Sequence, residues 1–309
     1  MIKRLKLSYM VYNFFQRKKL IHNVPLYKKL GLKKFYFSSV SSKDFKDVDA
    51  SLLKNEHPLH VEQTALYNEL STASRENIRA FYETGYVLLE KYLSSELVDN
   101  INHEIDTLIA NKTVSYRYIN KIMFAFHHSE LIRSVGEDKK LLELLSALLE
   151  GDAKLFQSIN FLMGSQQKTH SDSIHMTTFP LGGLLGVWIA LEDIDEESGP
   201  LHYYPGSHKF PYYLNSDYNN EGSAFLLGDQ DYTQYENMLA GKIETLKPEK
   251  KIITAKKGDL FIWHANLMHG GEPHLNKDKT RKSMVFHYYD RNCICYHEIT
   301  QRPALMMNN

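Results

Sequence analysis

The chain has 309 residues, 43% of them hydrophobic, and it carries equal numbers of basic and acidic residues, 37 each. This length fits one large β domain or two ordinary domains, and it can bury a large core without disulfide bonds. The balanced charge gives no sign of a polyanionic partner, and no apolar run approaches the roughly 20 residues that cross a bilayer.

The charge is unevenly distributed along the chain. Residues 1–43 hold eleven Lys or Arg and neither Asp nor Glu, which leaves 26 basic and 37 acidic residues in the remainder, a formal charge of −11. An acidic body argues against nucleic-acid binding. The two cysteines, Cys293 and Cys295, are too close for an ordinary disulfide within one strand. We therefore expect a reducing, cytoplasmic compartment.

Residues 1–43 are interpreted as a basic N-terminal appendage, in which Leu5, Tyr9, Tyr12 and Phe15 recur at near-helical spacing. Three interpretations stay open: a basic amphipathic segment that contacts an anionic membrane surface, an organellar transit peptide, and a peripheral helix with a solvated basic face. The segment lacks the compact apolar core of a secretory signal.

Residues 44–73 are mixed and polar, and we interpret them as a connector to a third segment, 74–309. That segment is predicted to begin with a short helix over 74–84, with Ser74 as N-cap and Gly85 as its end. A strand follows over 86–89.

Two further helices are expected before the chain changes character. Apolar residues repeat every four positions over 96–111, which predicts an amphipathic helix capped by Ser95. Another helix is expected over 139–149, ending at Gly151.

From Ala153 onward, short runs of aromatic and β-branched residues alternate with Gly, Pro and Asp. Strands are expected over 154–161, 186–191, 251–255, 259–263 and 283–290. Short strands separated by turns predict a mainly β domain, a barrel or a jelly roll, with the preceding helices at its flank. Residues 210–250 carry weak strand signals and are interpreted as an insertion, a candidate lid over the site.

One short motif in this β region could bind a metal ion. In a strand, residues i and i+2 point to the same face, so His170 and Asp172 can approach one ion together. His269 lies downstream, and two histidines with one carboxylate form the facial triad of non-haem Fe(II) oxygenases. A lone His-x-Asp is frequent in a chain with 15 histidines, and the alternative is two polar residues at the end of a strand.

The surrounding sequence resembles the phytanoyl-CoA dioxygenase family of Fe(II)- and 2-oxoglutarate-dependent oxygenases. The resemblance covers about residues 74–292, and its most specific part is a Gly-Pro-Leu motif at 199–201 followed by Pro-Gly-Ser-His at 205–208. It continues through 258–269 to Arg281. Residues 1–43 and 210–250 are not explained by it.

The resemblance implies a double-stranded β-helix, a jelly-roll or cupin-like core, and a set of site residues. His170, Asp172 and His269 would hold Fe(II), which also takes 2-oxoglutarate and O2. Arg281 stands twelve residues after His269, where the family binds the distal carboxylate of 2-oxoglutarate, and a guanidinium matches a carboxylate with two parallel hydrogen bonds. By spacing alone, Arg281 would be an ordinary charge in the basic run 277–282.

Other polar residues are candidates for weaker roles. Gln157, Asn160 and Gln167 could hydrogen-bond the cosubstrate or the substrate, and Trp188 either packs in the core or lies near the cosubstrate. His264 and His274 are rival ligands, disfavoured by strand parity and by a turn at Pro273. His175 is either a pocket residue or a satisfied core polar residue. These candidate roles complete the expected site.

The resulting hypothesis is a dioxygenase that hydroxylates a C–H bond of a small-molecule or acyl substrate and releases succinate and CO2. Two alternatives stay open: a non-catalytic jelly-roll binding protein, and a cupin-type metalloenzyme that does not use 2-oxoglutarate. Substrate specificity is expected in the loops at 111–135 and 210–250, whereas the substrate itself and the oligomeric state are not predicted.

Overall fold

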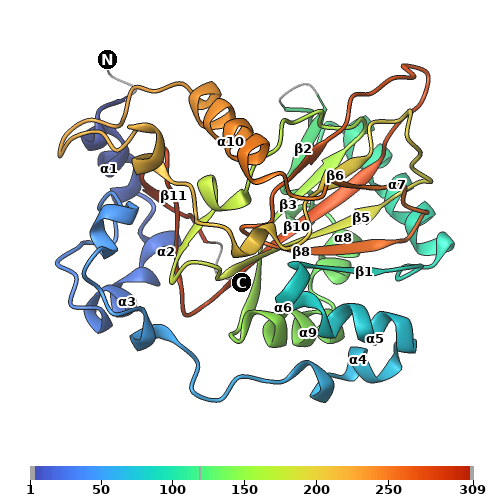
Figure 1. The fold of residues 1–309 in the computed structure, drawn as a ribbon, viewed down its shortest axis with the longest axis horizontal. Coiled ribbons are helices and arrows are strands. Elements are labelled where there is room, and N and C mark those ends of the chain that lie inside the picture. The colour runs from blue at the N-terminus through green and yellow to red at the C-terminus, as the bar shows by residue number, and fades with distance from the viewer. Residues whose placement is uncertain (1–3, 118–119, 307–309) are drawn as a thin grey trace.

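The largest element of the computed structural model, which describes residues 4–117 and 120–306, is a six-stranded antiparallel sheet (Figure 1). Residues 1–3, 118–119 and 307–309 of the predicted segments lie outside this description. The strand order is β1 (Tyr86–Leu89), β8 (Leu260–His264), β5 (Leu184–Ala190), β10 (Ser283–Asp290), β3 (Ala153–Phe161) and β2 (Lys121–Met123). Every residue of β5 and β10 is buried, because both faces of the sheet are covered.

A small sheet covers the inner face of the large one. It contains β7 (Lys251–Ile253), β6 (Leu201–Tyr203) and β9 (His269–Gly271). Leu201 and Tyr203 share a buried cluster with Trp188 and Phe261 of the large sheet. Two antiparallel sheets packed in this way form the barrel that the spacing of short strands predicted.

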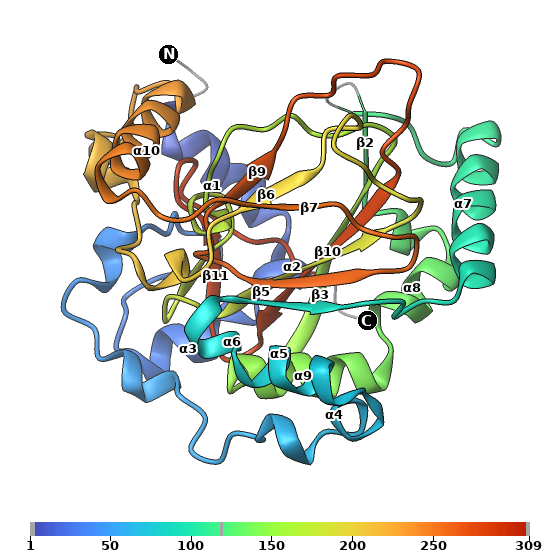
Figure 2. The ribbon, with the colours of Figure 1, turned by 45° about the vertical axis from the view of Figure 1, so that its right-hand side comes forward.

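Helices cover the outer face of the large sheet (Figure 2). They are α4 (Ala65–Glu69), α5 (Thr72–Arg79), α6 (Phe81–Thr84), α7 (Ser95–Ala110), α8 (Glu130–Gly136) and α9 (Lys139–Leu149). Ile101 of α7 and Leu144 of α9 share one buried cluster with Val187 of β5 and Phe286 of β10. The helices therefore close the outer side of the core.

The predicted bounds are confirmed for β1, β10 and α9, but two predicted caps are wrong by one to three residues. Ser71, not Ser74, accepts the backbone N–H at the start of α5, and Ser94, not Ser95, caps α7. In both cases a serine of extended conformation precedes the first helical residue, and the neighbouring serine already lies inside the helix. Gly85 ends α6 in the left-handed region, as predicted.

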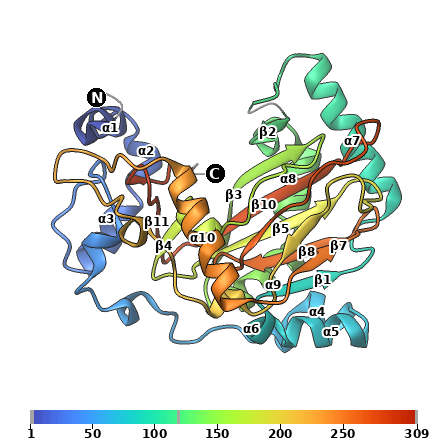
Figure 3. The same ribbon diagram turned by 45° about the horizontal axis from the view of Figure 1, so that its top comes forward.

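The N-terminal segment lies against the C-terminal strands (Figure 3). It forms α1 (Lys6–Phe14), α2 (Arg17–Leu20) and α3 (Asn23–Lys29), beside a third sheet of β12 (Arg302–Pro303), β11 (Ile294–His297) and β4 (Thr177–Phe179). Tyr27 and Val40 are buried with Tyr296 in one cluster. The N–H of Met306 donates to the carbonyl of Lys19 at 3.0 Å, so the C-terminal end of the described chain contacts the N-terminal segment.

The remaining segments are short helices and one long one. The 3-10 helices are η2 (Ser42–Phe45), η3 (Ala50–Leu53), η4 (Val61–Gln63), η5 (Ala125–His127), η6 (Asp172–Ile174), η7 (Ser207–Lys209) and η8 (Asn215–Tyr218). The long helix is α10 (Tyr232–Leu246), which the sequence did not predict. Its Tyr235 and Leu239 pack against Ile174 and Met268, beside the predicted metal ligands. Within the described residues, no helix combines the length and apolar character needed to span a membrane.

Candidate metal centre

His170, Asp172 and His269 lie together, as predicted, in the interior of the barrel. One ligand atom from each side chain can be chosen so that all three lie within 4.8 Å of one another. Asp172 Oδ1 is 3.8 Å from Nε2 of His170 and 3.9 Å from Nε2 of His269. All three side chains are buried. This spacing leaves room for one ion between two imidazole nitrogens and one carboxylate oxygen.

The backbone holds the two histidines opposite each other. His170 and His269 form an isolated antiparallel bridge, in which each N–H donates to the carbonyl of the other at 2.9 Å. Ser171 is extended, which places Asp172 on the same side as His170 before the chain turns into η6. His170 and Asp172 therefore face the same side, as the sequence predicted, although the extended segment that joins them is very short.

Each histidine has its δ nitrogen engaged by the backbone. Nδ1 of His170 lies 3.0 Å from the carbonyl of Lys168, and Nδ1 of His269 lies 2.9 Å from that of Leu267. A carbonyl only accepts, so Nδ1 donates in both rings and the Nε2 lone pair faces Asp172. Burial lowers the pKa of His170 to about 3, which keeps the ring neutral and able to bind a metal.

Asp172 uses its two oxygens differently. Oδ2 accepts a 2.8 Å hydrogen bond from Nε1 of Trp263 and lies 3.6 Å from Nε2 of His287, whereas Oδ1 faces the two ligand histidines. Burial alone would raise the pKa of Asp172, but His269, followed by His287 and His170, holds it well below its usual range. The carboxylate therefore stays ionised and offers one oxygen to an ion.

Trp263 fits beside Asp172 because Gly186 lies opposite it in the sheet. A Cβ on Gly186 would overlap the indole ring. Trp263 and His287 were not predicted as site residues. His287 did carry a signal, because it lies an even number of residues after Arg281 in the same predicted strand region, whereas nothing local marked Trp263.

Arg281 is a buried cation without an acidic partner among residues 4–117 and 120–306. It is 3% exposed, its Nη1 donates to Ser283 Oγ at 3.2 Å, and its Nε has no partner in that range. Its guanidinium carbon lies 5.5 Å from the ring centroid of Trp188. Burial lowers the pKa of Arg281 to about 10, so it remains charged at neutral pH. An unpaired buried charge is costly, and an anionic ligand would compensate it.

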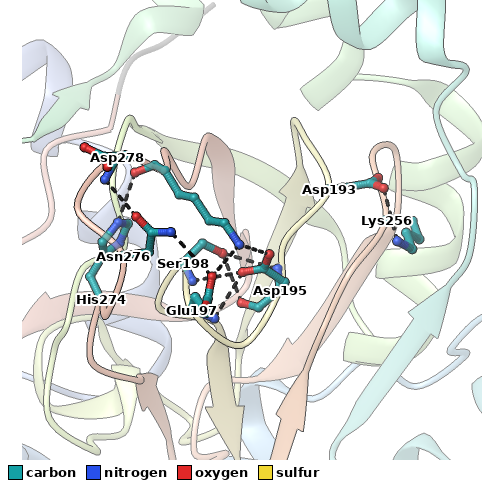
Figure 4. A network of polar contacts seen from close by, with 9 residues as sticks. Asp193, Asp195, Glu197, Ser198, Lys256, His274, Asn276 and Asp278 are labelled. Atoms are coloured by element: carbon teal, nitrogen blue, oxygen red, sulfur yellow. Dashed lines mark hydrogen bonds and ion pairs between the residues drawn. The ribbon is translucent and has the colours of Figure 1, made fainter.

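A polar network holds the loop that leads to Arg281 (Figure 4). Lys279 pairs with Asp195 and with Glu197, the latter at 2.7 Å. Glu192 accepts from Thr280 Oγ1 at 2.7 Å and from the N–H of Lys282 at 2.6 Å. Contacts on both sides of Arg281 thus fix the loop to the β5–β6 connection.

A cavity of about 600 Å³ opens beside the triad. Gln157, Gln167 and His175 line it, together with His170 and Asp172, whereas Trp188 and Arg281 lie together in the barrel interior. The cavity wall also includes Lys121, Met123, Phe156, Ile159, Met176, His287, Cys295, Tyr296, His297, Thr300, Arg302, Pro303 and Ala304. The lining residues of β2, β11 and β12 were not predicted, because they meet only through the fold.

The remaining candidates lie away from the triad. Asn160 borders a small pocket on the helix-covered side of the large sheet, with Asn102 and Ile105. The ring of His264 lies 5.4 Å from that of His208, and Nε2 of His274 contacts the carbonyl of Lys279 at 3.0 Å. The structure therefore separates the rival histidines from the predicted ligands.

Comparison with known proteins shows the family to which the chain belongs. The model of the phytanoyl-CoA dioxygenase family matches residues 81–283. The chain belongs to this family. The resemblance predicted from the motifs is confirmed, and with it the class of iron- and 2-oxoglutarate-dependent oxygenase.

Relatives align over most of the chain. Bovine phytanoyl-CoA dioxygenase domain-containing protein 1 is 28% identical over 253 residues, 78% of each chain. The ectoine dioxygenase of Halomonas elongata is 24% identical over 253 residues, 75% of this chain and 76% of that protein. These relatives support the family assignment over a longer region than the family model alone.

Solved structures confirm the predicted fold class. The carbocyclase SnoK from nogalamycin biosynthesis superposes with a TM-score of 0.60 at 16% identity, over 82% of this chain and 97% of SnoK. EctD from S. alaskensis superposes with a TM-score of 0.58 at 19% identity, over 83% of this chain and 90% of EctD. The core of this chain is the double-stranded β-helix expected from the sequence.

Proposed function

We propose that the protein hydroxylates a C–H bond of a small organic substrate that carries an anionic group. O2 and 2-oxoglutarate would be consumed, and the products would be the alcohol, succinate and CO2. The buried cluster of two histidines and one single-oxygen carboxylate, with an unpaired arginine in the same barrel, supports this reaction best. An EctD structure of the same fold contains 2-oxoglutarate and 5-hydroxyectoine.

The residues present fit the iron and the cosubstrate. Nε2 of His170, Nε2 of His269 and Oδ1 of Asp172 would hold Fe(II), and three protein ligands leave coordination positions for other molecules. Iron with 2-oxoglutarate supplies the activation of O2 that C–H hydroxylation needs. Arg281 would bind the distal carboxylate, because its guanidinium is buried, charged and without an acidic partner among the described residues.

The protein's own part is to orient and to exclude water. The carbonyls of Lys168 and Leu267 orient the two imidazoles, and Trp263 orients Asp172. Burial of all three ligands limits the access of bulk water to the side of the cavity, which a bound substrate would fill. These contacts thus set the position at which the reaction would occur.

The cavity favours an anionic substrate with an apolar body. Lys121 and Arg302 line it, and Asp172 is the only acidic residue among the described lining residues. The guanidinium carbon of Arg302 lies 3.5 Å from the ring centroid of Tyr9, and its Nε has no hydrogen-bond partner in the described chain. Apolar side chains such as Phe156 and Ile159 complete the wall. Acyl chains that end in a carboxylate or a phosphate match this lining.

The metal and cosubstrate sites can be tested without knowing the substrate. Under anaerobic conditions, Fe(II) with 2-oxoglutarate is expected to give a weak visible charge-transfer band. His170→Ala or Asp172→Ala should abolish the band, and His274→Ala, a histidine outside the triad, should retain it. If the wild-type protein binds neither Fe(II) nor 2-oxoglutarate, the proposal is wrong. Succinate production that requires 2-oxoglutarate excludes a cupin-type enzyme that does not use it.

The substrate class has its own test. Compounds with a terminal carboxylate or phosphate should stimulate 2-oxoglutarate turnover more than neutral analogues of the same length. Arg302→Gln should raise KM for the anionic compounds by about tenfold and leave the charge-transfer band unchanged. Equal stimulation by neutral analogues would contradict an anionic substrate while leaving the oxygenase assignment intact.

A further inference from the structure

The N-terminal helix exposes large apolar side chains on one face. We define the N-terminal apolar face as Leu7, Val11, Phe14, Phe15 and Phe35. Their exposed fractions are 67%, 53%, 53%, 76% and 67%, in that order. Residues 7, 11 and 14 lie on one side of a helix, because their spacings of three and four residues follow its turn. A grouped apolar surface of this kind marks an interaction site.

Ring contacts join the helix to the segment that follows α3. Phe14 lies 5.6 Å from Phe15 and 5.6 Å from Phe37, and Phe37 stacks on Phe35 at 5.3 Å, all between ring centroids. The hydroxyl of Tyr36 donates to the carbonyl of Phe14 at 3.0 Å. The apolar face is therefore one connected surface built from two segments.

Basic residues border this surface. Arg17 and Lys18 follow Phe15 closely, and Lys33 and Lys34 directly precede Phe35. Lys34 pairs with Asp44 at 3.0 Å, whereas Arg17 and Lys33 have no acidic partner in the described chain. Residues 1–43 contain no acidic residue. An exposed aromatic surface with a basic border complements an anionic lipid surface in both apolarity and charge.

The face is fixed to the body of the protein. Leu20 and Tyr27 are almost fully buried, and Tyr27 packs with Ile294 and Tyr296 of β11. Cleavage of residues 1–43 as a transit peptide would expose this core. A peripheral helix with a solvated basic face would turn its apolar residues inward, but the exposed side of α1 carries Leu7, Val11 and Phe14.

We propose that the N-terminal apolar face docks the protein on the surface of a membrane that contains anionic lipids. The aromatic side chains enter the headgroup region, and Arg17 and Lys33 lie against lipid phosphates and carboxylates. A second copy of this chain would bring the same basic border against itself. Charge complementarity therefore favours anionic lipid over self-association.

Vesicle binding by the full-length protein tests the proposal. The protein should sediment with vesicles of phosphatidylcholine and phosphatidylserine and much less with vesicles of phosphatidylcholine alone. The double variant Phe15→Ser/Phe35→Ser should lower the partition coefficient by about tenfold or more, because two aromatic side chains are lost from the interface. Arg17→Glu/Lys33→Glu should remove the preference for phosphatidylserine.

A matched control separates the face from general hydrophobicity. Leu246 and Leu275 are exposed apolar residues at the end of α10 and in the β9–β10 loop, with exposed fractions of 48% and 70%. Leu246→Ser/Leu275→Ser should bind vesicles as the wild type does, and circular dichroism should show that all variants are folded. An equal loss of vesicle binding in the Leu246→Ser/Leu275→Ser variant would overturn the proposal. So would a wild-type protein that does not bind phosphatidylserine vesicles. A dimer in solution that the Phe15→Ser/Phe35→Ser variant disperses, without vesicle binding, would assign the face to self-association instead.

Discussion

Trp263 and His287 engage one oxygen of Asp172 and leave the other oxygen for an ion. Trp263 and His287 face Oδ2, and the two ligand histidines face Oδ1. Groups that contact a ligand from behind fix its orientation and its basicity, so their loss changes metal binding without removing a ligand. Trp263 therefore acts as a positioning residue.

Replacing Trp263 by Phe should weaken metal binding by about 10- to 100-fold, because the hydrogen bond to Asp172 Oδ2 is lost. Titration of the metal-free protein against a competing chelator measures the change. Trp188→Phe is the matched control, since the indole N–H of Trp188 has no partner in the described chain. Unchanged affinity in the Trp263 variant would show that the hydrogen bond has no role in binding.

A second prediction at the residue scale concerns Arg281. Arg281→Met should raise the free energy of unfolding of the ligand-free protein by roughly 1 kcal/mol or more, because a buried unpaired cation is removed. At a concentration about 100 times its Kd, 2-oxoglutarate should stabilise the Fe(II)-loaded wild type by about 2.7 kcal/mol. It should not stabilise the variant. Calorimetric unfolding with and without 2-oxoglutarate provides both numbers, and equal stabilisation of the two proteins would separate Arg281 from the cosubstrate.

At the scale of elements, the sequence predicted the bounds of those helices and strands whose signals run through their whole length, and it missed elements with weak signals. The bounds of α9 were predictable because helical repeats run through its whole length. Those of β10 were predictable because its run of aromatic and β-branched residues ends at Asp290. The helix α10 was missed, since it buries only Tyr235 and Leu239 and its Tyr, Asn and Glu residues carry little amphipathic signal. Weakly amphipathic helices form through tertiary contacts that a local pattern does not contain.

The residues of the candidate site also divide into those that the sequence predicted and those that it could not predict. His170 and Asp172 follow from strand parity, whereas His269 and Arg281 needed the family motifs because they are distant in the sequence. Lys121 and Arg302 reach the cavity from β2 and β12, which are far apart in the sequence. Contacts of that kind depend on the fold and leave no local signal.

The prediction at the scale of elements concerns the contribution of the N-terminal helices to the stability of the protein. Leu20→Ala should lower the free energy of unfolding by about 2–5 kcal/mol, because Leu20 is fully buried and its removal leaves a cavity. Lys28→Ala, an exposed position of α3, should change it by less than about 0.5 kcal/mol. Urea unfolding of the full chain measures both. A negligible effect of Leu20→Ala would mean that the segment does not unfold with the rest of the protein.

The whole molecule contains many buried neutral histidines. Burial is the largest cause of a lowered pKa at five of them: about 4 for His22, His202 and His264, and about 3 for His170 and His297. Burial raises the pKa of Glu298, which acts in the opposite direction. An unfolded histidine takes up a proton near pH 6.5, so the unfolded state binds more protons than the folded state below that pH.

The free energy of unfolding of the metal-free protein should therefore fall as the pH drops from about 6.5 to about 4. The contribution of the histidines is fully present above their unfolded pKa and is lost as the pH approaches their folded pKa. Urea unfolding at a series of pH values measures the slope, and His22→Gln should reduce it by about one proton. A stability that stays constant or increases on acidification would contradict neutral burial of these rings.

The bridge between His170 and His269 has a consequence for which metal the protein carries. The bridge fixes the backbone of both ligands, and the carbonyls of Lys168 and Leu267 orient their rings, so we expect little further ordering when a metal ion binds. Sites of this kind follow the general affinity series of divalent metals, in which Ni²⁺, Cu²⁺ and Zn²⁺ bind more tightly than Fe²⁺. In protein purified from cells, iron would then compete poorly for the site with these metals. We expect the purified protein to contain whichever of them was available. Activity should appear only after that metal is removed with a chelator and replaced by Fe(II) in the absence of air.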